Sequence, residues 1–382
     1  MRTRLSIAAV ATLAALAACT DAATPPAAPL AEERRAGDAT ATGGVYTMTN
    51  GTAGNAVIAF RRAADGSLAP AGTHATGGLG TGGTIDPLVS QYAVILSGDN
   101  RLLFAVNAGS DEVSAFHVRR DAGLELASVA PSGGDLPVSL AVHENLLYVL
   151  NAGDNTLSGL RAVPSGELVR IPNSTRPLAA GAAGAAAVRF TPDGHYLIVT
   201  ERASARIETF PVLPNGRLGE PVVTASSGPA PFGFDVTPRN QPIVSEAATS
   251  AVSSYNLLSS GTLAVATASL GTGGRAACWL ILTADGGHAY VINAGTGTVT
   301  GAAVSAAGTL TLLDADGVTG ATGAGSTPLD PDLSEGDDFL YVLEAGTGTV
   351  GAFAVNADGS LTVLADTPAG TPASGLQGMA AY

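Results

Sequence analysis

The sequence contains no lysine: all 18 basic residues are arginine, against 32 acidic residues. The formal net charge is −14, and charged residues make up only 13% of the chain. A strongly acidic protein repels a phosphate backbone, which argues against nucleic acid as a partner. Apolar residues reach 46%, so the abundant glycine and proline belong to a turn-rich globular protein rather than to a disordered one.

Cysteine is nearly absent, with only Cys19 and Cys278. Two arginines precede an uncharged apolar run, residues 5–17, which is too short to span a membrane comfortably and ends in LAAC at Cys19. This ending resembles the bacterial lipobox, in which the chain is cleaved before a lipidated cysteine. We therefore predict a lipoprotein signal peptide at 1–18 and lipidation of Cys19; an ordinary secretory signal and an uncleaved anchor are the alternatives. If Cys19 is lipidated, no intrachain disulfide can form, and stability must come from packing.

The sequence also lacks any helical stripe of useful length, and a repeated β pattern takes its place. The motif YVINAGTGTV, which starts at Tyr290, combines a strand, a tight turn and a second strand. A further turn follows each copy, usually with glycine two residues before leucine. The spacing of these glycines from Gly66 to Gly359 is just under 49 residues, which indicates a repeat protein. The seven copies start at Tyr46, Phe104, Tyr148, Leu197, Ile243, Tyr290 and Tyr341.

Each repeat divides into four short antiparallel strands, and no linkers separate the repeats. This pattern is typical of a β-propeller, here an all-β propeller with seven blades spanning residues 44–382. The first repeat lacks an inner strand, and the chain ends in a strand-like segment, residues 374–382. We therefore expect the C-terminal strand to complete the N-terminal blade and to close the ring. Residues 19–43 are rich in alanine, proline and threonine and are predicted to be a flexible tether.

The motif at Tyr290, the turn TPDG at Thr191 and the segment NADGSLTVL at Asn356 resemble the YVTN-type repeats of the lactonase-like seven-bladed propellers. That family includes 6-phosphogluconolactonase and carboxymuconate cyclase. The similarity covers residues 44–382. It implies the same fold and suggests chemistry on a lactone or related cyclic acid, although the repeated motifs build blades and do not by themselves define a site.

One polar residue of each copy falls at the end of the second strand, and we expect these seven side chains to gather around the mouth of the central channel. Carboxylates there could act as a general base or, with the amides, hold Ca²⁺. The alternative is structural, because asparagine readily caps a turn with its own side chain. The candidates are Glu201 and Glu246 as catalytic groups, Asn107, Asn151, Asn293 and Glu344 as ligand-binding groups, and Asn50 as the seventh position.

The family comparison supports Glu201 and weakens the other assignments. Glu201 aligns with a family glutamate, whereas the family histidine falls on Ala187 and a family arginine falls on Ala247. A second family arginine falls near Cys278, which is otherwise expected to be an inert buried thiol. Arg202 remains a candidate ligand-binding residue beside Glu201.

These observations lead to two hypotheses about function. The first is an exported, lipid-anchored enzyme that opens or closes a lactone, although the export signal and missing arginines argue against 6-phosphogluconolactonase itself. The second is a non-enzymatic propeller of the cell envelope that binds a small molecule or a protein. In both cases we expect a monomer in the periplasm or on the cell surface, attached to the membrane only through its lipid, with no obligatory cofactor.

Overall fold

The computed structural model describes residues 42–371 and 374–382, so the predicted signal peptide, the lipidation site Cys19 and nearly all of the predicted tether lie outside the described residues. The described residues form one compact unit. Every regular element in the described part is a β-strand, and none of its segments is a helix that could cross a membrane.

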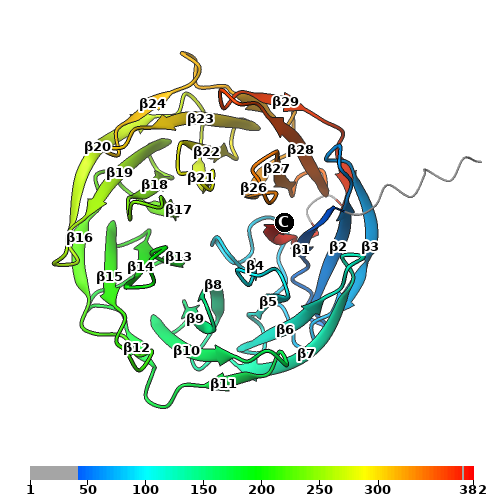
Figure 1. Ribbon diagram of the computed structural model, residues 1–382, viewed down its shortest axis with the longest axis vertical. Coiled ribbons are helices and arrows are strands. Elements are labelled where there is room, and N and C mark those ends of the chain that lie inside the picture. The colour runs from blue at the N-terminus through cyan, green and yellow to red at the C-terminus, as the bar shows by residue number, and fades with distance from the viewer. Residues whose placement is uncertain (1–41, 372–373) are drawn as a thin grey trace, which may run out of the picture. The chain divides into compact units, whose positions relative to one another are not determined.

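The strands form seven small antiparallel sheets arranged in a ring, which confirms the predicted seven-bladed propeller (Figure 1). Each blade has four main strands, and three blades carry an extra two-residue strand: β12 (Arg176–Pro177), β25 (Gly320–Ala321) and β30 (Thr367–Pro368). From the channel outward, blade 1 contains β31 (Gln377–Ala381), β1 (Gly43–Met48), β2 (Ala56–Arg62) and β3 (Leu68–Ala75), and blade 2 contains β4 (Val94–Leu96), β5 (Leu102–Asn107), β6 (Glu112–Val118) and β7 (Leu124–Pro131). In the same order, blade 3 contains β8 (Pro137–His143), β9 (Leu146–Asn151), β10 (Thr156–Ala162) and β11 (Leu168–Arg170), blade 4 contains β13 (Ala185–Phe190), β14 (Tyr196–Glu201), β15 (Arg206–Pro211) and β16 (Val222–Ala225), and blade 5 contains β17 (Pro231–Val236), β18 (Pro242–Glu246), β19 (Ala251–Leu257) and β20 (Leu263–Gly271). Blade 6 contains β21 (Ala277–Leu282), β22 (His288–Asn293), β23 (Thr298–Val304) and β24 (Leu310–Leu312), and blade 7 contains β26 (Pro328–Leu333), β27 (Phe339–Glu344), β28 (Thr349–Val355) and β29 (Leu361–Val363).

The ring closes as the sequence predicts, because the C-terminal strand β31 is the innermost strand of blade 1 and pairs with β1. Beyond this pairing, Arg62 Nε donates to the backbone carbonyl of Tyr382 over 3.0 Å. The rings of Tyr46 and Tyr382 stack with their centroids 6.4 Å apart. Two segments from opposite ends of the chain therefore share one sheet.

The two repeated sequence signals, the second-strand tyrosine and the turn glycine, meet at three of the interfaces between blades. At these three interfaces a tyrosine hydroxyl, and at three others a serine or threonine hydroxyl, donates to the carbonyl of the turn glycine in the next blade, which links six of the seven interfaces. Glycine suits this turn because its φ is positive, +82° at Gly66 and at Gly359. The donor–acceptor pairs are Tyr341 with Gly66, Ser128 with Gly166, Tyr148 with Gly216, Thr209 with Gly261, Ser254 with Gly308, and Tyr290 with Gly359.

We expect the substitution Tyr290→Phe to lower the free energy of unfolding by about 1–3 kcal/mol, because it leaves the buried carbonyl of Gly359 without its donor. Denaturant unfolding would measure the change. Tyr196→Phe is the matched control, since Tyr196 makes a similar hydrogen bond to Ser259 at an exposed position. Equal stability of the wild type and Tyr290→Phe would contradict a stabilising role for this contact.

The central channel is blocked by Ser90, Gln91 and Tyr92, which precede β4 and which we call the plug. Figure 1 shows the segment next to β4 reaching into the middle of the ring. Two residues at or near the plug have positive φ although they are not glycine, Val89 at 52° and Tyr92 at 70°, so the segment is held in a strained conformation. The plug forms hydrogen bonds with five blades. Its partners are Val138, Ala186, Phe234, Trp279, Leu280 and Gln377.

Candidate functional site

The structure buries all seven predicted ring residues, and their gathering around the channel mouth stays a prediction. Each of these residues is only 0–2% exposed. Asn293 is representative: its amide donates to Thr298 and Thr300 on the adjacent strand and accepts from Thr272. Such contacts fit the turn-forming alternative. The residues placed in this way are Asn50, Asn107, Asn151, Glu201, Glu246, Asn293 and Glu344.

The three carboxylates of the ring accept hydrogen bonds within their own blades, although the buried Oε1 atoms of Glu201 and Glu344 have no partner among the described residues. Glu201 accepts from Arg206 Nε at 2.9 Å and from the hydroxyl of Ser204 at 2.5 Å. Glu246 accepts from Ser253 and Ser269, and burial raises the pKa of Glu344 to about 7. Among the described residues, no group of three or more histidine, cysteine, aspartate or glutamate side chains is arranged to hold a metal ion. The catalytic assignments of Glu201 and Glu246 stay predictions, and both side chains are fully buried.

The plug divides the channel into two ends. We call the end near the termini of the second strands the strand-end mouth, and the end near the turns between first and second strands the turn mouth. The plug meets the inner strands at a repeated irregularity: six inner strands contain a β-bulge near their start, as at Ala186 in blade 4 and Cys278 in blade 6. Bulges commonly re-aim side chains beside functional sites.

A group of polar side chains lies on the strand-end side of the plug, and of these the sequence analysis named only Arg202 as a candidate ligand-binding residue. Asp86 is strained, with a φ of 45°, and its buried Oδ1 has no hydrogen-bond partner among the described residues. The same holds for Nε of Arg202 and for Oδ1 of Asp330. Buried polar atoms are rarely left unpaired in native proteins except at functional positions, which makes this group a candidate site. We call Asp86, Arg202, Cys278 and Asp330 the Asp86 cluster.

The charges within the Asp86 cluster act on one another. Burial is the main cause that raises the pKa of Asp86 to about 8; the negative charge of Asp330 raises it further and Arg202 opposes the rise. Burial also raises the pKa of the Cys278 thiol to about 12, so the thiol is protonated at neutral pH. Burial raises the pKa of Asp330 to about 7. The cluster therefore combines a carboxyl that titrates near neutrality with a guanidinium.

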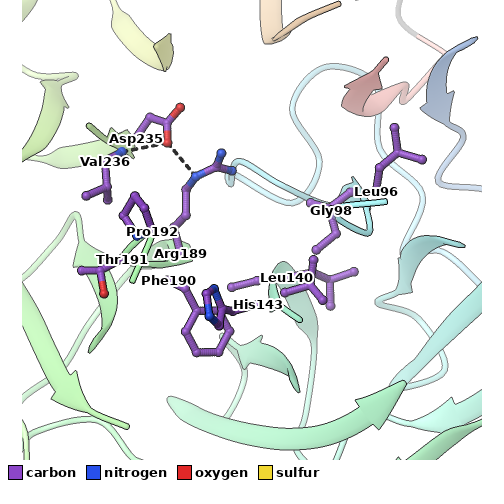
Figure 2. Close-up of a pocket in the computed structure, with 13 residues that line it drawn as sticks. Leu96, Gly98, Leu140, His143, Arg189, Phe190, Thr191, Pro192, Asp235 and Val236 are labelled. Atoms are coloured by element: carbon purple, nitrogen blue, oxygen red, sulfur yellow. Dashed lines mark hydrogen bonds and ion pairs between the residues drawn. The ribbon is translucent and has the colours of Figure 1, made fainter. Parts of the chain in front are cut away.

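The turn mouth contains a second polar group, an ion pair between inner strands of neighbouring blades. Nε of Arg189 on β13 lies 2.6 Å from Oδ1 of Asp235 on β17, and Figure 2 shows the pair projecting above Phe190 and His143. The guanidinium also lies over the ring of Tyr92, 4.6 Å from its centroid. The sequence contains one signal for these residues, namely a charged side chain within an otherwise apolar inner strand.

The fold and the site place the protein in the class of β-propellers whose central channel is blocked by a plug and contains polar groups. Sequence comparison identifies the family within this class. A sequence model of the lactonase family, described as a seven-bladed β-propeller, matches residues 53–256 and 243–376, and the chain belongs to this family. A search of curated proteins finds no match.

Solved structures confirm the fold. A protein from Lactobacillus plantarum superposes with a TM-score of 0.71 at 20% identity and covers 89% of this chain and 99% of its own. The periplasmic gluconolactonase of Pseudomonas aeruginosa gives a TM-score of 0.66 at 20% identity, over 86% and 97% of the two chains. Virginiamycin B lyase from Staphylococcus aureus gives 0.54 at 11% identity, over 77% and 90%. Because a lactonase and a lyase share the architecture, the fold alone does not define the reaction.

Proposed function

We propose that this member of the lactonase family is an exported, lipid-anchored protein that hydrolyses a small lactone or related cyclic acid ester at the strand-end mouth. The proposal rests on one observation, the unpaired buried atoms of Asp86, Arg202 and Asp330 beside the plug. Ester hydrolysis needs a base that activates water and a positive group that stabilises the developing oxyanion. The Asp86 cluster provides one of each.

In the proposed reaction, the carboxylate of Asp86 takes a proton from a water molecule as its oxygen attacks the lactone carbonyl. Arg202 faces the oxygen that becomes negative. The ring C–O bond then breaks, and the leaving alkoxide receives the proton from Asp86, which gives the open hydroxy acid. Cys278 does not serve as the nucleophile because its thiol stays protonated. In this scheme Glu201 is a positioning residue that fixes the turn beginning at Arg202 through its hydrogen bonds with Ser204 and Arg206.

The test is hydrolysis of a panel containing glucono-δ-lactone, δ-valerolactone and muconolactone, measured by acid release. Arg202→Gln is expected to lower kcat/KM by about 10²–10³-fold, the range for loss of one oxyanion-stabilising group. Arg120→Gln is the matched control at an exposed position of the turn between β6 and β7. Absence of turnover on every lactone by the wild type would reject the enzyme. Saturable binding of a lactone without turnover would then support the non-enzymatic binding propeller.

The proposed lipid anchor has a separate test. Cys19→Ser is expected to abolish incorporation of labelled palmitate and to move the protein from the detergent phase to the aqueous phase in a detergent partition experiment, because a thioether-linked lipid requires that cysteine. Cys278→Ser is the control, since this cysteine lies inside the propeller. Continued labelling of Cys19→Ser would contradict the anchor.

A further inference from the structure

The cavities at the turn mouth are separate from the Asp86 cluster, because the plug lies between them. One cavity of 330 Å³ and another of 460 Å³ adjoin each other, and both are lined by Gly98, Arg189 and Asp235. The combined space, which we call the Arg189 cavity, falls within the range of about 300–1,000 Å³ that is usual for small-molecule sites. Neither the Asp86 cluster nor the proposed reaction uses it.

The polar groups of the Arg189 cavity are fixed before any ligand binds. Asp235 accepts from the backbone N–H of Val236 at 2.7 Å and of Leu282 at 3.2 Å, in addition to its ion pair with Arg189. Tyr92, on which the guanidinium stacks, is held by a hydrogen bond of 2.7 Å from its hydroxyl to the carbonyl of Phe234. The site is therefore preorganised, which reduces the entropic cost of binding.

The guanidinium nevertheless keeps unused donors. The Arg189 side chain is 38% exposed, and the structure gives its two Nη atoms no hydrogen-bond partner among residues 42–371 and 374–382. Apolar walls lie beside it, and Figure 2 shows Leu140, Phe190 and His143 grouped on one side of Arg189. A ligand at this place meets hydrogen-bond donors next to an apolar surface.

The balance of charge selects the type of ligand. Arg189 and Asp235 cancel each other, and Asp332, which lines the same cavity, accepts from the backbone N–H groups of Leu333 and Ala381. Acidic residues of the neighbouring turn, Glu335 and Asp337, add further negative charge. The surrounding carboxylates repel an anionic ligand, and the guanidinium of Arg189 repels a cationic one. An uncharged hydrogen-bond acceptor avoids both penalties.

We propose that the Arg189 cavity is a second small-molecule site, which binds an uncharged organic molecule through a carbonyl oxygen on the Nη atoms of Arg189 and an apolar body against Leu140 and Phe190. The site is independent of the proposed hydrolysis at the strand-end mouth, from which the plug separates it.

The test uses two probes of nearly equal shape, cyclohexyl methyl ketone and cyclohexanecarboxylate, added to the purified full chain and followed by saturation-transfer NMR and calorimetry. The ketone is expected to bind at least tenfold more tightly than the carboxylate. Val142→Trp, which places a large ring in the cavity from a half-buried position, is expected to weaken ketone binding at least tenfold. Val169→Trp on the outer strand β11 is the matched control and is expected to leave it unchanged.

Two further variants separate the possible outcomes. Arg189→Lys keeps the positive charge beside Asp235 but removes the Nη donors, and it is expected to weaken ketone binding with an unchanged melting temperature. Asp86→Asn is expected to bind the ketone as the wild type does, even if it has lost hydrolysis. The proposal is overturned if the wild type does not bind the ketone, if the carboxylate binds equally well, or if Val142→Trp binds as the wild type does.

Discussion

Deletion of residues 374–382 is expected to unfold the protein, because it removes β31, the innermost strand of blade 1. The strand contributes the buried side chains of Met379 and Ala380, and Leu376 just before it is also buried. Each large apolar side chain contributes about 1.5–3 kcal/mol, and the whole fold is stable by only about 5–15 kcal/mol.

The deletion also removes the partners of buried carboxylates. Asp330 loses the donors Gly378 and Gln377, and Asp332 loses Ala381. A buried charged group without its donors costs about 1–3 kcal/mol or more. These losses add to the missing strand pairing with β1, so their sum reaches the total stability of the fold.

Circular dichroism and thermal melting would measure the result. The matched control is deletion of residues 20–40 from the predicted tether, which is expected to leave the melting temperature unchanged. If the chain without residues 374–382 still melts cooperatively within a few degrees of the wild type, the closing strand is not essential to the ring.

The fold could be predicted from the sequence because its signals repeat. The glycine before the fourth strand recurs at a nearly constant interval, and four of the seven motif copies begin with a tyrosine. The structure shows one reason, because Tyr290 and Gly359 are hydrogen-bonded across a blade interface. The missing inner strand of the first repeat and the strand-like C-terminus likewise implied closure. A contact that recurs in successive blades leaves a periodic trace in the sequence.

The candidate site leaves no such trace. Asp86 and the plug lie in a connection between blades that occurs once, so no repeat marks them. The residues that do repeat, such as Asn293 and Glu246, serve the turns of their own blades. Periodicity therefore identified positions that the structure buries. Arg202 entered the sequence analysis only through its neighbour Glu201, and the unpaired atom of Asp86 became visible only in three dimensions.

Asp86→Asn is expected to lower kcat/KM for lactone hydrolysis by about 10²–10⁴-fold, the usual contribution of a general base. In the wild type, the pKa of Asp86 is raised to about 8, mainly by burial, so only a minor fraction of the enzyme carries the active carboxylate at pH 7. The rate is expected to rise with pH up to about 8 and then to level off. Residual activity in Asp86→Asn is expected to lack this rising limb.

A stability measurement separates catalysis from a structural role. Because the folded-state pKa of Asp86 lies above the ordinary aspartate value of 3.8, the folded state holds its proton more tightly, and this group's contribution to stability falls as the pH rises from about 4 to about 8. Asparagine cannot ionise, so Asp86→Asn is expected to match or exceed the wild type in melting temperature at pH 9. If Asp86→Asn loses activity but keeps or gains stability, the carboxyl group of Asp86 serves catalysis and lowers the stability of the fold. Loss of both would instead assign Asp86 to the architecture of the plug and remove the base from the proposed reaction.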